Sequence, residues 1–412
     1  MRLKHVVITG LGAISPLGTG ADQLFTALKA GQSGIDRVPE LEKIGGLGPR
    51  IAGLVRNVDP KQIPRKNRRS MSRMSIYALL AAQEALAQGM VDDITRTQGR
   101  LGIVLGSTVG SAETMEAFFK EYLQSKSIEH IKSMMFFRIM GHSCAANVAQ
   151  SLGITGRTLA PSAACSTGCQ SVGLGYETIA LGRQDMMLCG GADEFHPLTA
   201  GTFDIMHAAS TAYNETPDQT PRPFDTDRDG IVCSEGAGIL LLESLDSAQA
   251  RGAEILAEVV GFASTSDTSN IANPDPAPLT DCMQAALDDA HTDITDVDYV
   301  NAHATGTIFG DEAECRAIAK LFGPDIAVSS LKGHLGHTMA ASGALELIAC
   351  VHMLRTGTLI PTRNLDNPAP ECSGVRLLRQ VEHAAINTII KNNFALGGVN
   401  CTIALRRYTH DR

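Results

Sequence analysis

Short apolar runs recur along the chain and alternate with longer stretches in which apolar positions have helical spacing. In a first series, the runs predict strands at 6–12, 101–107, 157–164, 185–192 and 237–243. The stretches between them predict helices at 71–88, 166–181 and 198–209. Apolar strands that alternate with helices predict an α/β fold with mainly parallel sheets covered by helices.

A second series repeats this layout. It predicts strands at 257–263, 297–302, 326–330, 386–392 and 401–406, and helices at 279–290, 312–321 and 338–354. Each series contains one helix built from small residues, beginning near Ser166 and near Met339. Because small side chains let a helix approach sheets on both sides, we expect these helices at the centre of two related halves, 1–252 and 253–412.

Composition narrows the possible functions. The 412 residues are 44% hydrophobic and 19% charged, which is typical of a globular protein with a large buried interior. The formal net charge of −9 offers no general attraction for nucleic acid or an anionic membrane, and no apolar run approaches the ~18 residues that span a bilayer. The N-terminal apolar run is too short for a signal peptide, and the ten cysteines lack paired spacing. We therefore expect a cytoplasmic protein with reduced thiols.

Cys165 is the strongest candidate nucleophile. It lies between a predicted strand and the first small-residue helix. The positive end of the helix dipole and the unpaired N–H groups at a helix start favour the thiolate, which is the reactive form of cysteine. From position alone, a buried structural cysteine is the more common alternative.

Two histidines have settings suited to catalysis. His303 follows an apolar strand and opens a loop rich in Gly and Thr, and His337 precedes the second small-residue helix. We expect an imidazole at a helix start to remain neutral and to donate one hydrogen bond. A metal site built from His303, His334 and His337 is the rival interpretation, but no carboxylate or thiolate lies at a familiar spacing.

The acidic residues near these histidines have simpler explanations. Glu346 lies on an otherwise apolar helix, where an isolated charge would be costly to bury, so we expect Lys332 to pair with it. A surface position for Lys332 is the alternative. Asp311 and Glu314 lie ahead of an apolar helix at the spacing of a capping box, which we favour over an acid–base pair.

The ordered motifs of the chain resemble those of the elongating β-ketoacyl-[acyl carrier protein] synthases of the thiolase-like superfamily. The resemblance spans essentially the whole chain, and the set is highly specific although each motif alone is weak. The motifs are VITGLG (7–12), SPLG (15–18), APSAACSTG (160–168), RPFDTDRDG (222–230), SEGAG (234–238), NAHATGT (301–307), KGHLGHTMAASG (332–343) and NFALGGVN (393–400). The resemblance implies a thiolase-like α/β fold, with two pseudo-equivalent βαβαβαββ halves in α-β-α-β-α layers.

The resemblance also implies a decarboxylative condensation. Cys165 would accept an acyl group from a carrier-protein thioester. His303 and His337 would hydrogen-bond the malonyl thioester oxygen and stabilise the enolate formed as carbon dioxide leaves, and the family's catalytic lysine falls on Lys332. The backbone N–H groups of Cys165 and Leu396 would hold the oxyanion of the condensation step. Neither a metal nor a redox cofactor is implied.

Further positions follow from the same resemblance. We expect Thr305 and Thr307 to contact the pantetheine arm. The other expected residues are the supporting Glu346 and Phe394 and an acyl pocket of Thr108, Val109, Phe136 and Phe137, the last two reaching across a dimer interface. Leu396 occupies the place of a gating phenylalanine, and Ala272 lies near the place of a threonine. These departures favour a specialised synthase for a polyene, polyketide or unusual lipid.

A basic segment in this acidic chain indicates an acidic partner. Arg65, Lys66, Arg68, Arg69 and Arg73 open a predicted amphipathic helix, where positive charge does not favour helix formation. The resembling synthases dock the acidic acyl carrier protein on such a patch, although a solvated charge run is the simpler alternative. The resemblance also implies a homodimer, or a heterodimer with a related subunit.

Three other interpretations remain open. A coenzyme A-dependent thiolase-type acyltransferase would want a second catalytic cysteine in a C-terminal loop, where this chain has Gly397 and Gly398. A non-catalytic partner subunit would lack the nucleophile, whereas this chain keeps Cys165. An initiating synthase would use asparagine in place of His337.

Overall fold

The computed structural model describes residues 3–409, and within them twelve strands form one sheet. The first half of the chain contributes β1 (Val6–Ser15), β2 (Gly18–Thr19), β5 (Leu101–Gly106), β6 (Thr158–Leu159), β7 (Met186–Asp193) and β8 (Gly236–Ser244). The second half contributes β9 (Ala257–Ser266), β10 (Tyr299–Asn301), β11 (Ala327–Ser329), β13 (Arg376–Leu377), β15 (Thr388–Phe394) and β16 (Val399–Arg406). The order is β13-β11-β10-β15-β16-β9-β1-β8-β7-β5-β6, with β2 beside β1.

The two halves have the same strand order and polarity. From the centre outward, β1-β8-β7-β5-β6 and β9-β16-β15-β10-β11 each pass through two antiparallel and then two parallel pairings. The halves meet where β1 pairs antiparallel with β9, from Val6↔Val259 to Ile8↔Ala257. The expectation of mainly parallel sheets is wrong, because the longest strands pair antiparallel and neighbours such as β15 and β16 are joined by a short turn.

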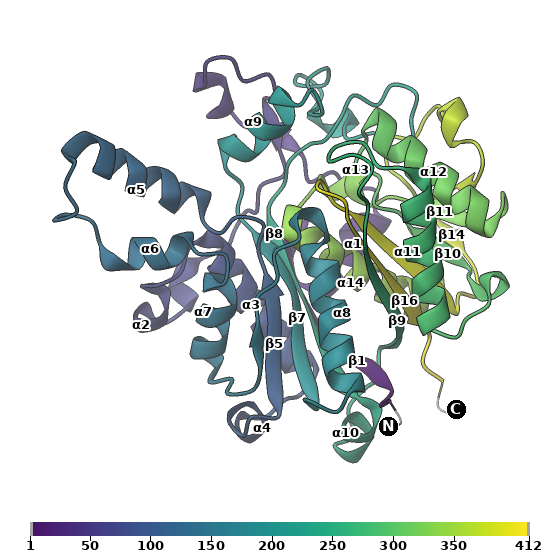
Figure 1. The fold of residues 1–412 in the computed structure, drawn as a ribbon, viewed down its shortest axis with the longest axis horizontal. Helices are drawn as coiled ribbons and strands as arrows, with labels where there is room; N and C mark the ends of the chain where they lie inside the picture. Colours follow the sequence, from purple (N-terminus) through teal and green to yellow (C-terminus); the bar gives the residue numbers. More distant parts are fainter. Residues whose placement is uncertain (1–2, 410–412) are drawn as a thin grey trace.

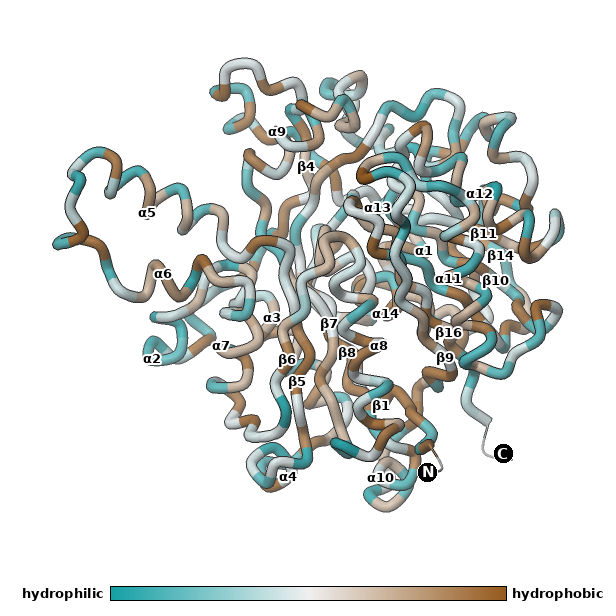
Figure 2. Tube along the Cα trace, viewed as in Figure 1, coloured by the Kyte–Doolittle hydropathy of each residue, from teal (hydrophilic) through white to brown (hydrophobic). Residues whose placement is uncertain are grey.

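Helices lie in three layers around these strands (Figure 1). On the outer face of the first half lie α3 (Arg73–Gln88) and α7 (Ser143–Leu152), and on that of the second half lie α11 (Pro276–Asp289) and α12 (Ile308–Phe322). Between the halves, α8 (Thr167–Ala180) and α14 (Ser342–Thr356) contact strands of both. This is the α-β-α-β-α arrangement that the resemblance implies. Hydrophobic residues follow strands such as β5 (Figure 2).

The two central helices cross without side chains at the point of contact. A Cβ atom on Gly168 of α8 would lie 2.5 Å from the carbonyl oxygen of Ala340, and one on Gly343 of α14 would lie 2.5 Å from the backbone nitrogen of Cys169. Neither position can carry a side chain unless the backbone moves. The crossing therefore fixes the two helix starts relative to each other.

The remaining elements connect these layers. They are α1 (Ala21–Lys29), α2 (Arg65–Arg68), α4 (Asp93–Thr97), α5 (Ala112–Ser125), α6 (Ser133–Ile139), α9 (Pro197–Ile205), α10 (Leu245–Ala250), α13 (Lys332–Leu335) and the two-stranded sheets β3 (Asp36–Arg37)–β4 (Ile51–Ala52) and β12 (Thr358–Leu359)–β14 (Glu382–His383). The hairpin of α5 and α6, which the sequence did not reveal, projects from the body of the molecule (Figure 1). No helix among residues 3–409 is long and apolar enough to cross a membrane.

Candidate active site

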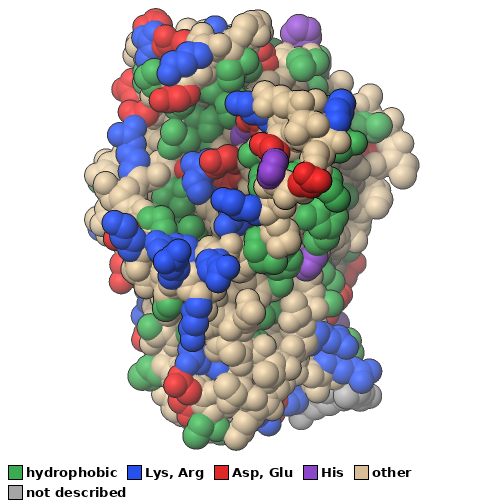
Figure 3. Space-filling model, turned by 90° about the vertical axis from the view of Figure 1, so that its left-hand side faces the viewer, with side chains coloured by type: hydrophobic (Ala, Val, Ile, Leu, Met, Phe, Trp, Pro, Cys, Tyr) green, Lys and Arg blue, Asp and Glu red, His purple; other side chains and the backbone are tan. Residues whose placement is uncertain are grey.

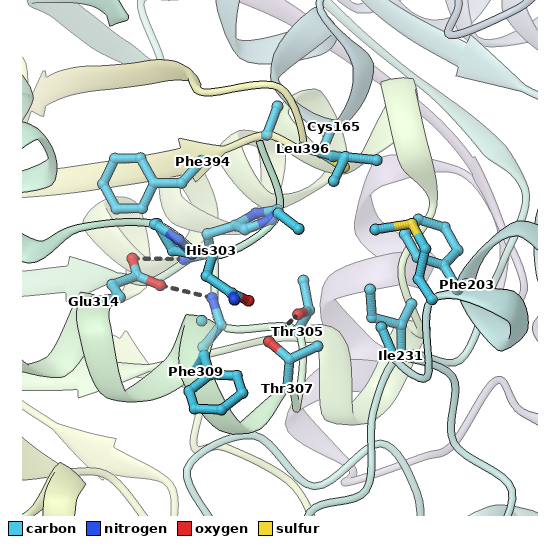
Figure 4. A pocket seen from close by; sticks show the side chains of 18 of the residues that line it. Cys165, Phe203, Ile231, His303, Thr305, Thr307, Phe309, Glu314, Phe394 and Leu396 are labelled. Carbon is cyan, nitrogen blue, oxygen red and sulfur yellow. Dashed lines mark hydrogen bonds between the residues drawn. The ribbon is translucent and has the colours of Figure 1, made fainter. Parts of the chain in front are cut away.

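Cys165 lies in a 3₁₀ turn, Ala164–Ser166, that leads directly into α8. Ala164 has a φ of +46°, a left-handed conformation that is unfavourable for a residue other than glycine and that turns the chain sharply before the thiol. The Cys165 side chain is 6% exposed and lines a cavity of about 430 Å³ (Figure 4). The turn thus places the thiol at the bottom of an accessible space.

Burial dominates the protonation of this thiol. It raises the pKa of Cys165 to about 11, although the backbone N–H of Leu396, the charge of Lys332 and the backbone N–H of Cys165 itself oppose the rise. The expectation that the helix start favours a resting thiolate is therefore wrong, because desolvation outweighs these terms. The two N–H groups that act on the sulfur come from different halves of the chain. They would also stabilise negative charge on an atom bound beside it.

Each active-site histidine has a defined tautomer. His337 Nε2 lies 2.9 Å from Cys165 Sγ, and the rings of His303 and His337 are 5.4 Å apart between centroids. The backbone N–H of Met339 donates to His337 Nδ1, and the side-chain amide of Asn393 donates to His303 Nδ1, both at 3.3 Å. Because both Nδ1 atoms accept, each neutral ring carries its proton on Nε2.

Both imidazoles are held in the neutral form. Burial and, to a smaller extent, the charge of Lys332 lower the pKa of His337 to about 3. Burial, and then Lys332, also lower the pKa of His303 well below its ordinary value. The neutral state expected from the sequence is therefore present, but its main cause is burial rather than a helix end. Each ring can donate a hydrogen bond from Nε2 without carrying a charge.

The same three side chains resemble a metal-ligand set. Ligand atoms of Cys165, His303 and His337 lie within 4.8 Å of one another. A metal-bound histidine normally donates its other ring N–H to an acceptor, whereas both rings here accept a hydrogen bond on Nδ1. His334 lies outside the cluster, with its ring nitrogens 3.1 Å from two backbone carbonyl oxygens. The arrangement suits donation to an oxygen atom better than metal binding.

A buried ion pair supports the histidines. Lys332 Nζ lies 2.7 Å from Glu346 Oε1, and both side chains are at most 2% exposed. Ser342 Oγ donates to the same oxygen at 3.1 Å. The structure therefore forms the ion pair that the sequence predicts, and the charge of Lys332 acts on both imidazoles.

Asp311 and Glu314 do not form a capping box. Both are buried on α12, where Glu314 accepts the backbone N–H groups of His303 at 2.8 Å and Ala304 at 2.7 Å. Asp311 accepts the backbone N–H of Gly306 at 3.1 Å. The capping interpretation is wrong because tertiary contacts bring the loop after β10 against α12, which local spacing does not show. The two carboxylates instead fix the backbone that carries His303.

The cavity wall combines expected residues with others that the sequence did not reveal. Thr305 and Thr307, whose hydroxyl oxygens are 3.2 Å apart, line it together with Leu396 (Figure 4). Phe203 and Ile231 form part of the facing wall (Figure 4). They are ordinary apolar residues in the sequence, so no chemical signal identifies them. Two further expected residues, Phe394 and Ala272, also line the cavity.

The expected acyl-pocket residues lie elsewhere. The backbone N–H of Thr108 donates to Asp193 Oδ1 at 3.0 Å, and Phe137 packs edge-to-face against the ring of His142. Val109 and Phe136 are each 57% exposed. Among the described residues of one chain, these four do not line the cavity around Cys165. Their assignment to an acyl pocket stays a prediction that requires a second subunit.

Only some of the positive side chains of the basic segment are exposed and lack an ion-pair partner among the described residues. Lys and Arg side chains gather on the face that carries α2, α5 and α6 (Figure 3), and Arg65, Lys66 and Arg69 are exposed there. Arg68 is half-buried. Arg73 differs, because its guanidinium lies 3.3 Å from a Glu113 oxygen and donates to the carbonyl oxygen of Phe195 at 2.7 Å.

Two domain families cover most of the chain. The β-ketoacyl synthase N-terminal domain matches residues 3–248, and the β-ketoacyl synthase C-terminal domain matches residues 256–366. The chain therefore belongs to the β-ketoacyl synthase family of condensing acyltransferases.

Similar proteins agree with this membership. A 3-oxoacyl-[acyl-carrier-protein] synthase 1 of Haemophilus influenzae is 35% identical over 98% of this chain and 100% of its own length. A crystal structure of a β-ketoacyl synthase from Burkholderia phymatum matches with a TM-score of 0.95 at 40% identity, over 98% of this chain and 100% of its own. A type II polyketide synthase acyl-carrier protein in complex with its ketosynthase, bound to a hexaketide, gives a TM-score of 0.91 at 27% identity, over 99% of this chain and 100% of the matched chain. The resemblance, the thiolase-like fold and the condensing reaction class expected from the sequence are thereby confirmed.

Proposed function

We propose that the protein is a β-ketoacyl-[acyl carrier protein] synthase, which condenses an acyl group held on Cys165 with a malonyl unit. One observation carries the proposal: a buried thiol, two neutral imidazoles with protons on Nε2 and two backbone N–H groups converge on one cavity. We assign the nucleophile to the half 1–252 and the histidines to the half 253–412. Neither a metal nor a redox cofactor enters this chemistry.

The first step transfers the acyl group. Cys165 Sγ attacks the thioester carbonyl, a new S–C bond forms, the carrier's S–C bond breaks, and the thiol proton leaves with the carrier thiol. The backbone N–H groups of Cys165 and Leu396 hold the carbonyl oxygen as charge develops on it. Because burial raises the pKa of Cys165 to about 11, the thiol has to lose its proton as the new S–C bond forms.

The second step makes the carbon–carbon bond. The bond between the malonyl carboxylate and its neighbouring carbon breaks, carbon dioxide leaves, and the electron pair remains as an enolate. His303 and His337 donate Nε2–H to the enolate oxygen. The enolate carbon then attacks the acyl carbonyl on Cys165, and collapse of the oxyanion expels the thiolate, which takes a proton from solvent.

The substrate arm and the carrier protein need their own contacts. Thr305 and Thr307 line the cavity and can hydrogen-bond the amides of a pantetheine arm. The exposed charges of Arg65, Lys66 and Arg69 and the half-buried charge of Arg68 complement an acidic carrier protein. The carrier-protein substrates and partners named for the similar proteins support both assignments. Arg73 is assigned to the rim of this surface because Glu113 already pairs with it.

Intact-mass measurements test the reaction. The purified protein would be mixed with malonyl-loaded carrier protein and a panel of acyl-loaded carrier proteins. We expect a transient acyl adduct on the enzyme and a β-ketoacyl product. Absence of both across the panel would contradict a stand-alone synthase and favour a partner subunit that needs a catalytic companion.

Charge reversal tests the docking surface. Arg68→Glu/Arg69→Glu should raise the KM for carrier-protein substrates about tenfold and leave substrates attached to free pantetheine unchanged. Lys29→Glu/Lys43→Glu, at exposed positions outside the basic segment, is the matched control. An equal loss with both kinds of substrate would contradict docking at this segment.

We also propose a dimer, because the α5–α6 hairpin exposes apolar side chains that a second subunit would cover. They are Phe119, Leu123, Ile128, Met134 and Phe136. A homodimer is the first expectation, and a heterodimer with a related subunit is the second. Light scattering of the pure protein distinguishes them, because only a homodimer forms without a second kind of subunit.

All ten cysteines are buried free thiols, which supports a cytoplasmic setting. The Leu396 gate supports a specialised synthase, which competition between unsaturated and saturated acyl chains would test.

A further inference from the structure

Lys391 is a second lysine buried beside the active-site ion pair. It lies on β15 and is fully buried, and its Nζ is 2.7 Å from Glu346 Oε2. The other carboxylate oxygen of Glu346 is 2.7 Å from Lys332 Nζ. The contact of Lys391 is an ion contact rather than an aligned hydrogen bond, and Lys391 also donates to the backbone carbonyl of Asn392. One carboxylate is therefore held between two ammonium groups.

These three charges do not cancel. Glu346 alone leaves the two lysines with a formal charge of +1, and a further anion is the buried carboxylate of Glu314, whose charge acts on Lys332 and which is acted on by Lys391. Lys332 alone would neutralise Glu346, so the pair does not need Lys391 for charge balance. The second lysine therefore adds a positive charge close to two buried carboxylates, Glu346 and Glu314.

The strand that carries Lys391 also holds His303. Asn393, two residues on and on the same face of β15, donates its side-chain amide to His303 Nδ1 at 3.3 Å. On the opposite face, Asn392 donates to Glu314 at 3.2 Å, and Glu314 accepts the backbone N–H of His303. A displacement of Lys391 would therefore disturb His303 through two sets of contacts, that of Asn393 on one face of the strand and that of Asn392 on the other.

We propose that Lys391 is an electrostatic positioning residue: with Lys332 it clamps Glu346, and its ammonium adds to that of Lys332 in opposing protonation of His303 and His337. The inference rests on the proposed function, in which both rings must stay neutral to donate Nε2–H. After burial and Lys332, the charge of Lys391 is a further cause that lowers the pKa of each ring. The other titratable groups around the two rings are Cys165, Asp193, Glu314, Lys332 and Glu346.

The variant Lys391→Met removes the charge and keeps most of the side-chain volume. We expect malonyl decarboxylation to fall about tenfold at neutral pH, where both rings stay neutral, because Glu346 and the strand that carries Asn393 lose a support. The acid limb of the pH profile, the range in which decarboxylation falls as the pH falls, should move to higher pH by roughly one unit. Acyl transfer to Cys165, followed by intact mass, should be nearly unchanged because it does not use the enolate. Lys391→Gln, which keeps a hydrogen-bond donor for Glu346, serves if the methionine variant does not fold.

Ile389→Ala is the matched control, because Ile389 is fully buried on the same strand and face and carries no charge. It should lower the melting temperature without moving the acid limb. An unmoved acid limb in the Lys391 variants, or an equal shift in Ile389→Ala, would overturn the proposal.

Titration of ¹⁵N-labelled histidines gives a readout independent of activity. The pKa values of His303 and His337 should rise in Lys391→Met, and unchanged values would overturn the proposal. If the wild-type protein forms neither an acyl adduct nor a product, the proposed function fails, while this titration still decides the role of Lys391.

Discussion

The two central helices begin alike but carry different chemistry. α8 follows a 3₁₀ turn whose first residue, Ala164, has a φ of +46°, and α14 follows a 3₁₀ turn whose first residue, Met339, has a φ of +51°. Each left-handed residue lies beside a functional side chain, Cys165 in the first case and His337 in the second. The duplicated strand order explains this likeness, since both helices occupy the same place in their half.

The difference lies in buried charge. The buried positions of α8 are small or apolar and uncharged, whereas α14 buries Glu346 between two lysines. One half therefore presents a nucleophile from an uncharged helix, and the other presents hydrogen-bond donors beside a helix that buries a charge. A duplicated fold can thus divide covalent chemistry from charge stabilisation without changing its architecture.

The largest expected effect on activity comes from removing the nucleophile of the first half or a hydrogen-bond donor of the second. Cys165→Ala should abolish the acyl adduct and lower condensation by at least about 10⁴-fold, because no other thiol lines the cavity within residues 3–409. His303→Ala should retain the acyl adduct and lose decarboxylation. Intact mass and carbon dioxide release measure the two steps separately.

Val172→Ala, a buried position on α8 away from the helix start, is the control for general damage to the first half. If His303→Ala removed the acyl adduct as completely as Cys165→Ala does, the division of labour between the halves would be refuted.

A smaller effect is expected from the helix crossing. Gly168→Ala and Gly343→Ala should each lower the free energy of unfolding by roughly 1–3 kcal/mol, because the new Cβ would lie 2.5 Å from backbone atoms of the other half. Urea denaturation measures the change. Gly45→Ala, whose Cβ would meet nothing within 4 Å, is the control. Equal stability of all three variants would show that the crossing is loose.

At any one pH near neutrality, the smallest effect is expected on acid stability, which tests the contribution of the second half. Burial lowers the pKa of His337 to about 3, so between that pH and about 6.5 the unfolded chain binds a proton that the folded chain does not. Stability should therefore fall as the pH falls through this window, by up to ~1.4 kcal/mol per pH unit for this histidine. His337→Asn should flatten the slope of unfolding free energy against pH.

The exposed His130 gives the matched control, and His130→Asn should leave the slope unchanged. A slope in His337→Asn as steep as that of the wild type would show that His337 is not neutral in the folded protein.

The long elements of the fold were readable from the sequence because each buries an apolar face. β1, β7, β8, β9 and β16 all lie where apolar runs predict them. The polarity of pairing was not readable, since it depends on which connections are tight turns. The capping interpretation of Asp311 and the expected Cys165 thiolate failed for a shared reason: local spacing shows neither tertiary contacts nor depth of burial.

Lys391 was missed although the sequence carried its signal. A lysine directly after Ile389 and Ile390 in a predicted strand raises the same question of burial cost that led to the prediction of a Lys332–Glu346 pair. The partner could not be named, because Glu346 already had one. Once Lys332 was assigned to Glu346, the sequence offered no reason to look for a second lysine beside the same carboxylate, although a folded core can hold all three charges together.

Leu396 separates two tasks between its backbone and its side chain. Its N–H acts on the Cys165 sulfur, whereas its isobutyl group forms part of the cavity wall. Substitution at this position therefore alters the shape presented to an incoming chain and leaves the donor in place. If the proposed gate is correct, a single codon would adjust the range of acyl chains while the bond-forming groups stay in place, and position 396 would be a practical entry point for redesign.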